Sequence, residues 1–79
     1  LSSAINDRTD EYGGVLANRA KFVREIVQAI RARVGRDFHL QMKISATEYN
    51  NALLATEKAG NTLTDSVQVC QWLKDDGVD

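Results

Sequence analysis

The sequence predicts a single β-strand, and one strand cannot complete a sheet by itself. Between residues 38 and 45 apolar residues alternate with polar ones, which is the period of a strand with two different faces. The apolar positions are Phe38, Leu40, Met42 and Ile44, and the polar positions are His39, Gln41, Lys43 and Ser45. The backbone donors and acceptors of a strand need neighbouring strands. We therefore expect those strands to come from other parts of a longer chain, or from another copy.

Two amphipathic helices are predicted on either side of this strand. The first runs from Leu16 to Val34 and ends at Gly35, with an apolar stripe that Phe22, Ile26 and Ala29 widen. The second runs from about Thr64 to Asp75 and ends at Gly77, after a capping box of Thr62 and Asp65. Its predicted apolar face holds Leu63, Val67, Cys70 and Leu73, with Trp72 beside it. Residues 1–14 and 46–61 are predicted to be loops.

This order of elements favours an α/β fold. A strand between two amphipathic helices is the repeat unit of a parallel sheet. Strands of an open sheet covered by helices on both faces read as continuous apolar runs, whereas this strand has a polar face. We therefore predict a segment of a closed (β/α)8 barrel, in which the polar face points inward and Lys43 and Ser45 lie toward the rim where barrel active sites are built. Residues 1–79 would be a partial segment of one barrel domain, not a complete domain.

Composition narrows the possible partners. The chain has 79 residues, enough for one small domain at most, and 10 basic against 11 acidic residues. A net charge of −1 argues against general nucleic-acid or membrane binding. One cysteine excludes an intrachain disulfide and a cysteine-based zinc site. No apolar run approaches the roughly 20 residues of a membrane span. We expect a cytoplasmic protein that binds neither nucleic acid nor membrane.

Lys43 is the main candidate for a functional residue. An inward lysine is costly unless it is solvated or paired with an anion. It could face a cofactor or substrate anion, form a Schiff base as in a barrel aldolase, or serve in a structural ion pair. His39 lies near the start of the strand and is predicted to be a hydrogen-bonded core residue. Tyr49, in the loop above the rim, is a candidate for contact with substrate.

The N-terminal stretch resembles the signature of a known family. Residues 6–14, Asn-Asp-Arg-Thr-Asp-Glu-Tyr-Gly-Gly, are followed by Asn18, Arg19 and Phe22. This pattern is similar to Asn-x-Arg-Thr-Asp-x-Tyr-Gly-Gly-Ser-x-Glu-Asn-Arg-x-Arg-Phe of the Old Yellow Enzyme family of FMN-dependent NADH:flavin oxidoreductases. The likeness covers nearly the whole chain. Val15, Ala17 and Lys21 depart from the pattern, and the first two remove polar caps from the helix start.

The resemblance implies a fold, a cofactor and a reaction. It places the chain at the loop after the fourth barrel strand, the fourth helix, the fifth strand and the fifth helix. It implies FMN as cofactor, NAD(P)H as reductant and a small-molecule substrate, and it puts Lys43 beside the flavin N1 and O2. The family's substrate-binding pair and phosphate loops would lie outside residues 1–79, so no catalytic residue and no metal site is expected within them. The alternative is a non-catalytic module that self-associates through its apolar faces.

Overall fold

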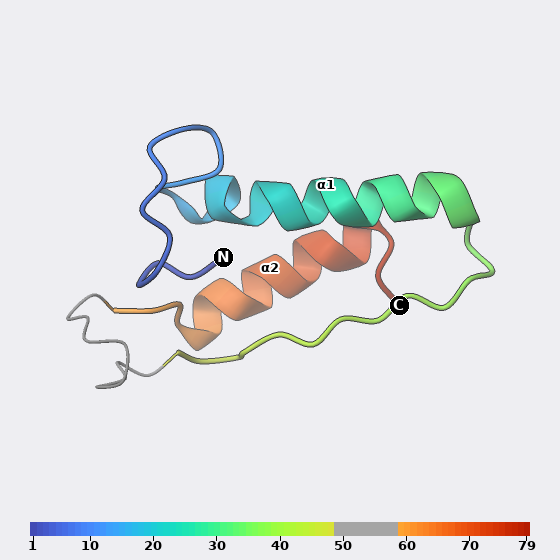
Figure 1. Cartoon of the computed structure of the whole chain (residues 1–79). Coiled ribbons are helices and arrows are strands. Elements are labelled where there is room, and N and C mark those ends of the chain that lie inside the picture. Colours follow the sequence, from blue (N-terminus) through green and yellow to red (C-terminus); the bar gives the residue numbers. More distant parts are fainter. Residues whose placement is uncertain (49–58) are drawn as a thin grey trace.

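The computed structural model describes residues 1–48 and 59–79, and within them it contains two helices, α1 (Leu16–Val34) and α2 (Leu63–Asp76). The two helices pack against each other, and the extended residues 38–48 run along α2 on the side away from most of α1 (Figure 1). Helix α1 has the predicted bounds. Helix α2 begins one residue before and ends one residue after the predicted range.

The ends of the helices follow from local sequence. Thr62 accepts a hydrogen bond from the Asp65 N–H and Asp65 accepts one from the Thr62 N–H, so the predicted capping box is confirmed. Gly77 ends α2 with a φ of 120°, a conformation that favours glycine. Val15 precedes α1 without a side-chain cap, as the departure from the family pattern predicted. Helix α1 therefore begins without the stabilisation that a polar cap supplies.

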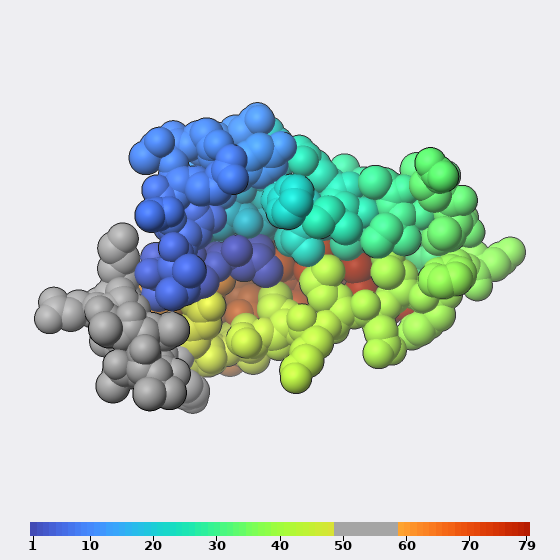
Figure 2. Space-filling view, viewed as in Figure 1, coloured from blue at the N-terminus to red at the C-terminus, as the bar shows by residue number. Residues whose placement is uncertain are grey.

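The core lies between the two helices and is small. Its four buried apolar residues are Ala20, Val27, Val69 and Leu73. The partly buried residues packed around them are Leu16, Val23, Leu40, Ile44, Trp72 and Val78. Leu40 and Ile44 are the only members from the extended segment, so this segment rests on the core at alternate positions. Figure 2 shows atoms of α2, orange to red, between α1 and the extended segment, which therefore covers only part of that helix.

The predicted strand does not form within the described residues. Residues 39–45 are extended but belong to no sheet. Their backbone has isolated partners: the Asp79 N–H donates to the Leu40 carbonyl at 2.9 Å, and the Ser66 hydroxyl donates to the carbonyls of Ser45 and Ala46. A hydrogen-bonded ladder needs a neighbouring strand, and residues 1–48 and 59–79 contain none. The prediction of a β-strand is therefore wrong within the described residues, although the segment follows an extended course along α2 (Figure 1).

The predicted helix faces are only partly buried. Leu73 is buried as expected, but Cys70, Leu63 and Val67 are exposed, and α2 instead buries Ser66 and Val69. On α1, Phe22 and Ile26 are also exposed. Two helices in contact bury one stripe each, and both stripes here are narrower than the apolar faces of the sequence. Of the four residues on the predicted apolar face of α2, only Leu73 is therefore buried.

An ion pair ties the two helices together at the end of α2. Arg24 Nε lies 2.6 Å from Asp76 Oδ2, and Gln28 Nε2 lies 2.8 Å from Asp76 Oδ1. The Asp76 side chain is 7% exposed. The hydrogen bond from Arg24 is the main cause that lowers the pKa of Asp76, and Gln28 adds to it. The carboxylate thus stabilises the helix pair above its unfolded pKa, near 3.9, and this stabilisation is lost as the pH falls below that value.

Removing this carboxylate should loosen the contact between the helices. We expect Asp76→Ala to lower the free energy of unfolding by about 2 kcal/mol, the scale of hydrogen bonds to a charged group. Urea unfolding followed by circular dichroism at pH 7 measures the change. Asp75→Ala, at the exposed neighbouring position, is the matched control and should have a much smaller effect. An equal loss in both variants would contradict the role given to Asp76.

Candidate functional site

The alternation of residues 40–45 separates the helix-facing side chains from Lys43. Leu40 and Ile44 pack against the core, and Met42 lines a groove beside α2. Lys43 is exposed, and it forms no ion pair with a carboxylate of residues 1–48 or 59–79. Successive residues of extended backbone point to opposite sides, so the alternation assigns Lys43 to the side away from the helices. A cation in this position suits an anionic group supplied from outside the described residues.

His39 shares the polar side of the segment and is not a core residue. Its Nε2 lies 3.1 Å from Gln41 Oε1, and its Nδ1 lies 3.5 Å from Asp79 Oδ2. The contact with Gln41, two residues along, confirms that these positions share one side. The side chain is 70% exposed, so the expectation of a buried histidine is wrong here, although the expected hydrogen bonding is present. The elements that would enclose this side of a barrel are not among the described residues.

The N-terminal loop is held by its own polar side chains. Arg8 forms a forked contact with Asp10, whose Oδ1 also accepts from the Tyr12 N–H at 3.1 Å. Asn6 accepts from the Arg8 N–H at 3.0 Å and donates to the Tyr12 carbonyl at 2.9 Å. Arg8 and Asp10 are therefore paired within the loop. Because Arg8 is engaged by Asp10, the loop offers a rigid turn rather than a free cation.

Arg19 and Asn61 connect this loop to the start of α2. Arg19 donates to the Leu1 carbonyl and to Asn61 Oδ1, both at 2.9 Å, and also to the Gly14 carbonyl. Asn61 is 7% exposed and donates to the same Leu1 carbonyl at 3.0 Å. Sequence reasoning assigned no role to Asn61, because no local pattern links residues that are 42 positions apart. Its only signal was its place just before the Thr62 cap.

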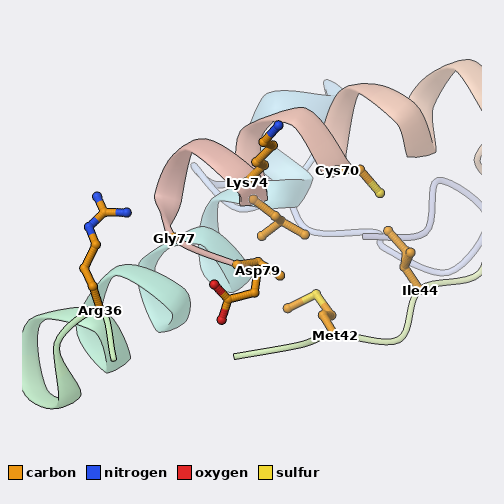
Figure 3. Close-up of a pocket in the computed structure, with 9 residues that line it drawn as sticks. Arg36, Met42, Ile44, Cys70, Lys74, Gly77 and Asp79 are labelled. Atoms are coloured by element: carbon orange, nitrogen blue, oxygen red, sulfur yellow. The ribbon is translucent and has the colours of Figure 1, made fainter. Parts of the chain in front are cut away.

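A groove of about 690 Å³ lies between the extended segment and the end of α2 (Figure 3). Met42 and Ile44 approach it from one side, and α2 and the turn after it supply the other side. The residues of that second side are Cys70, Leu73, Lys74, Gly77, Val78 and Asp79. Most of the lining is apolar, but Arg36, Lys74 and Asp79 add charged groups at its edges, so the groove suits an apolar group with polar neighbours.

Two further predictions concern Tyr49 and the absence of a metal site. Tyr49, the candidate for substrate contact, lies outside the described residues. Among residues 1–48 and 59–79, no group of three or more His, Cys, Asp or Glu side chains is arranged to hold a metal ion. Lys43 stays the site residue predicted from the sequence.

A sequence model of the NADH:flavin oxidoreductase / NADH oxidase family matches residues 1–79. The chain belongs to this family. The family has a β/α-barrel fold, and two helices with an extended segment between them are consistent with a piece of such a barrel. The assignment of these elements to the fourth helix, fifth strand and fifth helix stays a prediction. In the described part of the chain, neither helix has the length and hydropathy needed to cross a membrane.

Curated relatives give the same classification. The chain is 40% identical over 79 residues to an NADPH dehydrogenase of Bacillus cytotoxicus, and 39% identical over 79 residues to an NADPH dehydrogenase of Halalkalibacterium halodurans. Both alignments cover all of this chain but only 20% and 21% of the respective relative. The chain thus spans about one fifth of the length of these relatives. No solved structure gives a significant match.

The forked contact in the N-terminal loop should be visible in the titration of Asp10. The hydrogen bond from Arg8, followed by that from the Tyr12 N–H, lowers the pKa of Asp10 to about 2. In Arg8→Met we expect this pKa to rise toward 3.8 but to stay below it, because the Tyr12 N–H remains. Carboxyl carbon shifts measured by NMR from pH 1.5 to 6 report the value.

The lowered pKa of Asp10 means that the N-terminal loop is more stable when this carboxyl is ionised. The ordering of the loop is strongest above the unfolded pKa of aspartate, near 3.9, and is lost as the pH falls toward 2. Lys21→Met removes a neighbouring cation that pairs with Glu11, and it should leave the pKa of Asp10 unchanged. An unchanged Asp10 titration in Arg8→Met would show that Arg8 does not hold the loop.

Proposed function

We propose that this chain is a segment of an FMN-dependent oxidoreductase that passes hydride from NAD(P)H to an electron-poor alkene or a similar acceptor. The match of the flavin oxidoreductase family model to all 79 residues carries this proposal. The NADPH dehydrogenases that the chain resembles add support. The reaction belongs to the whole protein, because residues 1–79 span only about a fifth of such a relative.

Lys43 is the residue of this segment that we assign to the cofactor. FMN, when bound, takes up two electrons and leaves negative charge at its N1 and O2 edge. The Lys43 ammonium is exposed and unpaired by the described carboxylates, so it is free to stabilise an anion. A lysine supplies a compact point charge, whereas an arginine would supply a planar fork. The donor chemistry of this position therefore fits the edge of a reduced flavin.

The rest of the site would come from outside the segment. The family resemblance places the substrate-binding pair and the phosphate loops beyond residues 1–79, so we propose that the 79-residue chain alone is inactive. Its main partner would be the remainder of the barrel. A second copy is the alternative partner, since Phe22, Ile26 and Val67 leave apolar surface in solvent. Tyr49 stays a predicted substrate contact, and a cytoplasmic location stays a prediction from composition.

Substitution of Lys43 in the intact flavoprotein tests its role. Lys43→Met should lower the reduction potential of the flavin and slow its reduction by NAD(P)H. Loss of one charge-assisted contact corresponds to about 1–3 kcal/mol, or roughly 5- to 150-fold in rate. Lys43→Arg should have a smaller effect, because the charge remains. Photoreduction against a reference dye gives the potential, and stopped-flow absorbance gives the rate.

Two controls make the result interpretable. Lys21→Met removes a lysine of α1 that pairs with Glu11 in the N-terminal loop, and it should leave both quantities unchanged. Borohydride reduction with a carbonyl substrate would trap a covalent adduct on Lys43 only if the residue forms a Schiff base, which would favour an aldolase. An unchanged potential and rate in Lys43→Met would contradict the proposed contact with flavin.

A further inference from the structure

We propose that Arg31 and Asp79 are positioning residues that fix which side of the extended segment Lys43 occupies. This inference rests on the proposed function of Lys43 and adds the contacts that hold it in place. Neither residue lies next to Lys43 in sequence, and neither is assigned a part in the chemistry. Both contact the backbone at the beginning of the extended segment. The orientation of the backbone there sets the side on which each later side chain lies.

Arg31 joins three parts of the chain that are distant in sequence. Its Nε donates to the Gly77 carbonyl at 2.6 Å, and one terminal nitrogen donates to the carbonyls of Gly35 and Phe38. The other terminal nitrogen lies 2.9 Å from Asp79 Oδ2. The side chain is 11% exposed, so these acceptors replace most of its contact with water. An arginine with all three of its side-chain nitrogens engaged in this way is held in one orientation.

Asp79 holds Leu40 by both of its backbone groups. The Leu40 N–H donates to Asp79 Oδ2 at 2.8 Å, and the Leu40 carbonyl accepts from the Asp79 N–H at 2.9 Å. The same carboxylate oxygen accepts from Arg31. The charged pair therefore fixes both the position and the rotation of the peptide groups on either side of Leu40.

The turn after α2 is shaped to receive Arg31. Gly77 has a φ of 120°, and a Cβ at this position would lie 2.6 Å from Arg31 Cγ. Any side chain at residue 77 would therefore displace the stem of the arginine as well as strain the backbone. The close fit places Arg31 between the end of α2 and the beginning of the extended segment.

Fixing Leu40 determines where Lys43 lies. With Leu40 turned toward the core, Met42 and Ile44 follow on the same side and Lys43 lies on the opposite side. A slip of one residue would turn Lys43 toward the helices and Met42 away from them. Within the described residues, the bonds to Asp79 hold the beginning of the segment in register, and the Ser66 hydroxyl bonds to the Ser45 and Ala46 carbonyls hold its end. The pair of Arg31 and Asp79 is thus the described contact that sets this register at the beginning of the segment.

The opposite charges of the two residues give a test that separates positioning from simple electrostatics. If these residues acted on a flavin only through their charges, Arg31→Met would lower its potential and Asp79→Ala would raise it. If they act by positioning Lys43, both variants lower the potential. Arg31→Lys should also lower the potential, because the forked contacts are lost. The charge remains in this variant, so a charge effect alone would leave the potential unchanged. Arg33→Met, at an exposed position in the same last turn of α1, is the matched control and should leave the potential unchanged.

The experiment uses the intact flavoprotein loaded with FMN, with the midpoint potential as the first readout. We expect Arg31→Met, Arg31→Lys and Asp79→Ala each to shift the potential in the direction of Lys43→Met. The double variant Arg31→Met/Lys43→Met should match Lys43→Met alone, since Arg31 acts through Lys43. Hydrogen exchange in the flavin-free protein is the second readout, and Asp79→Ala should speed the exchange of the Leu40 amide.

The outcomes distinguish this inference from the proposed function. An unchanged potential in Lys43→Met overturns the proposed contact with flavin and this inference with it. A lowered potential in Lys43→Met with unchanged values in Arg31→Lys and Asp79→Ala overturns only the positioning role. A raised potential in Asp79→Ala also overturns it, in favour of long-range charge. If Arg31→Met does not fold, Arg31→Lys and Asp79→Ala decide the question by the same criteria.

Discussion

The unpaired backbone of the extended segment is the constraint on which the rest of this structure depends. Residues 39–45 follow an extended course along α2 (Figure 1), but their backbone partners in the described chain are isolated bonds with Asp79 and Ser66. A strand without a ladder contributes little to stability. The burial that does occur is limited to the two helices and the residues that rest on them. Apolar residues such as Phe22, Val67 and Met42 are exposed for the same reason, because the described residues supply no element that covers them.

Charged side chains supply contacts that the small apolar core and the unpaired extended segment do not. Arg24 joins α1 to the end of α2 through Asp76, Arg19 joins α1 to residues 1 and 61, and Arg31 joins it to residues 38, 77 and 79. These three arginines on one helix hold the loop, the extended segment and the end of the chain against a core of four buried apolar residues. Lys43, in contrast, has no such partner in the described chain, and its place on the polar side of the extended segment is what singles it out as the cation assigned to a ligand.

Local signals explain which features could be predicted from the sequence. The helices followed from apolar spacing, and their ends followed from the Thr62 cap and from Gly35 and Gly77. The assignment of Lys43 to the side away from the helices rests on alternation and stays a prediction. The exposure of Cys70 could not be predicted, because it depends on which elements cover α2. The contacts of Arg31 and Asn61 also escaped prediction, since they join residues more than 40 positions apart and leave no periodic pattern.

Amide hydrogen exchange of residues 41–45 tests most directly whether this chain is a piece of a barrel whose strand is completed from elsewhere. The measurement compares the dilute 79-residue chain with the full-length flavoprotein, under identical conditions. We predict that these amides exchange at nearly unprotected rates in the isolated chain and are slowed by orders of magnitude in the full-length protein, where neighbouring strands supply acceptors. Dilution of the isolated chain keeps a second copy from acting as that neighbour. Strong protection in the dilute chain, or equal exposure in both proteins, would contradict this account.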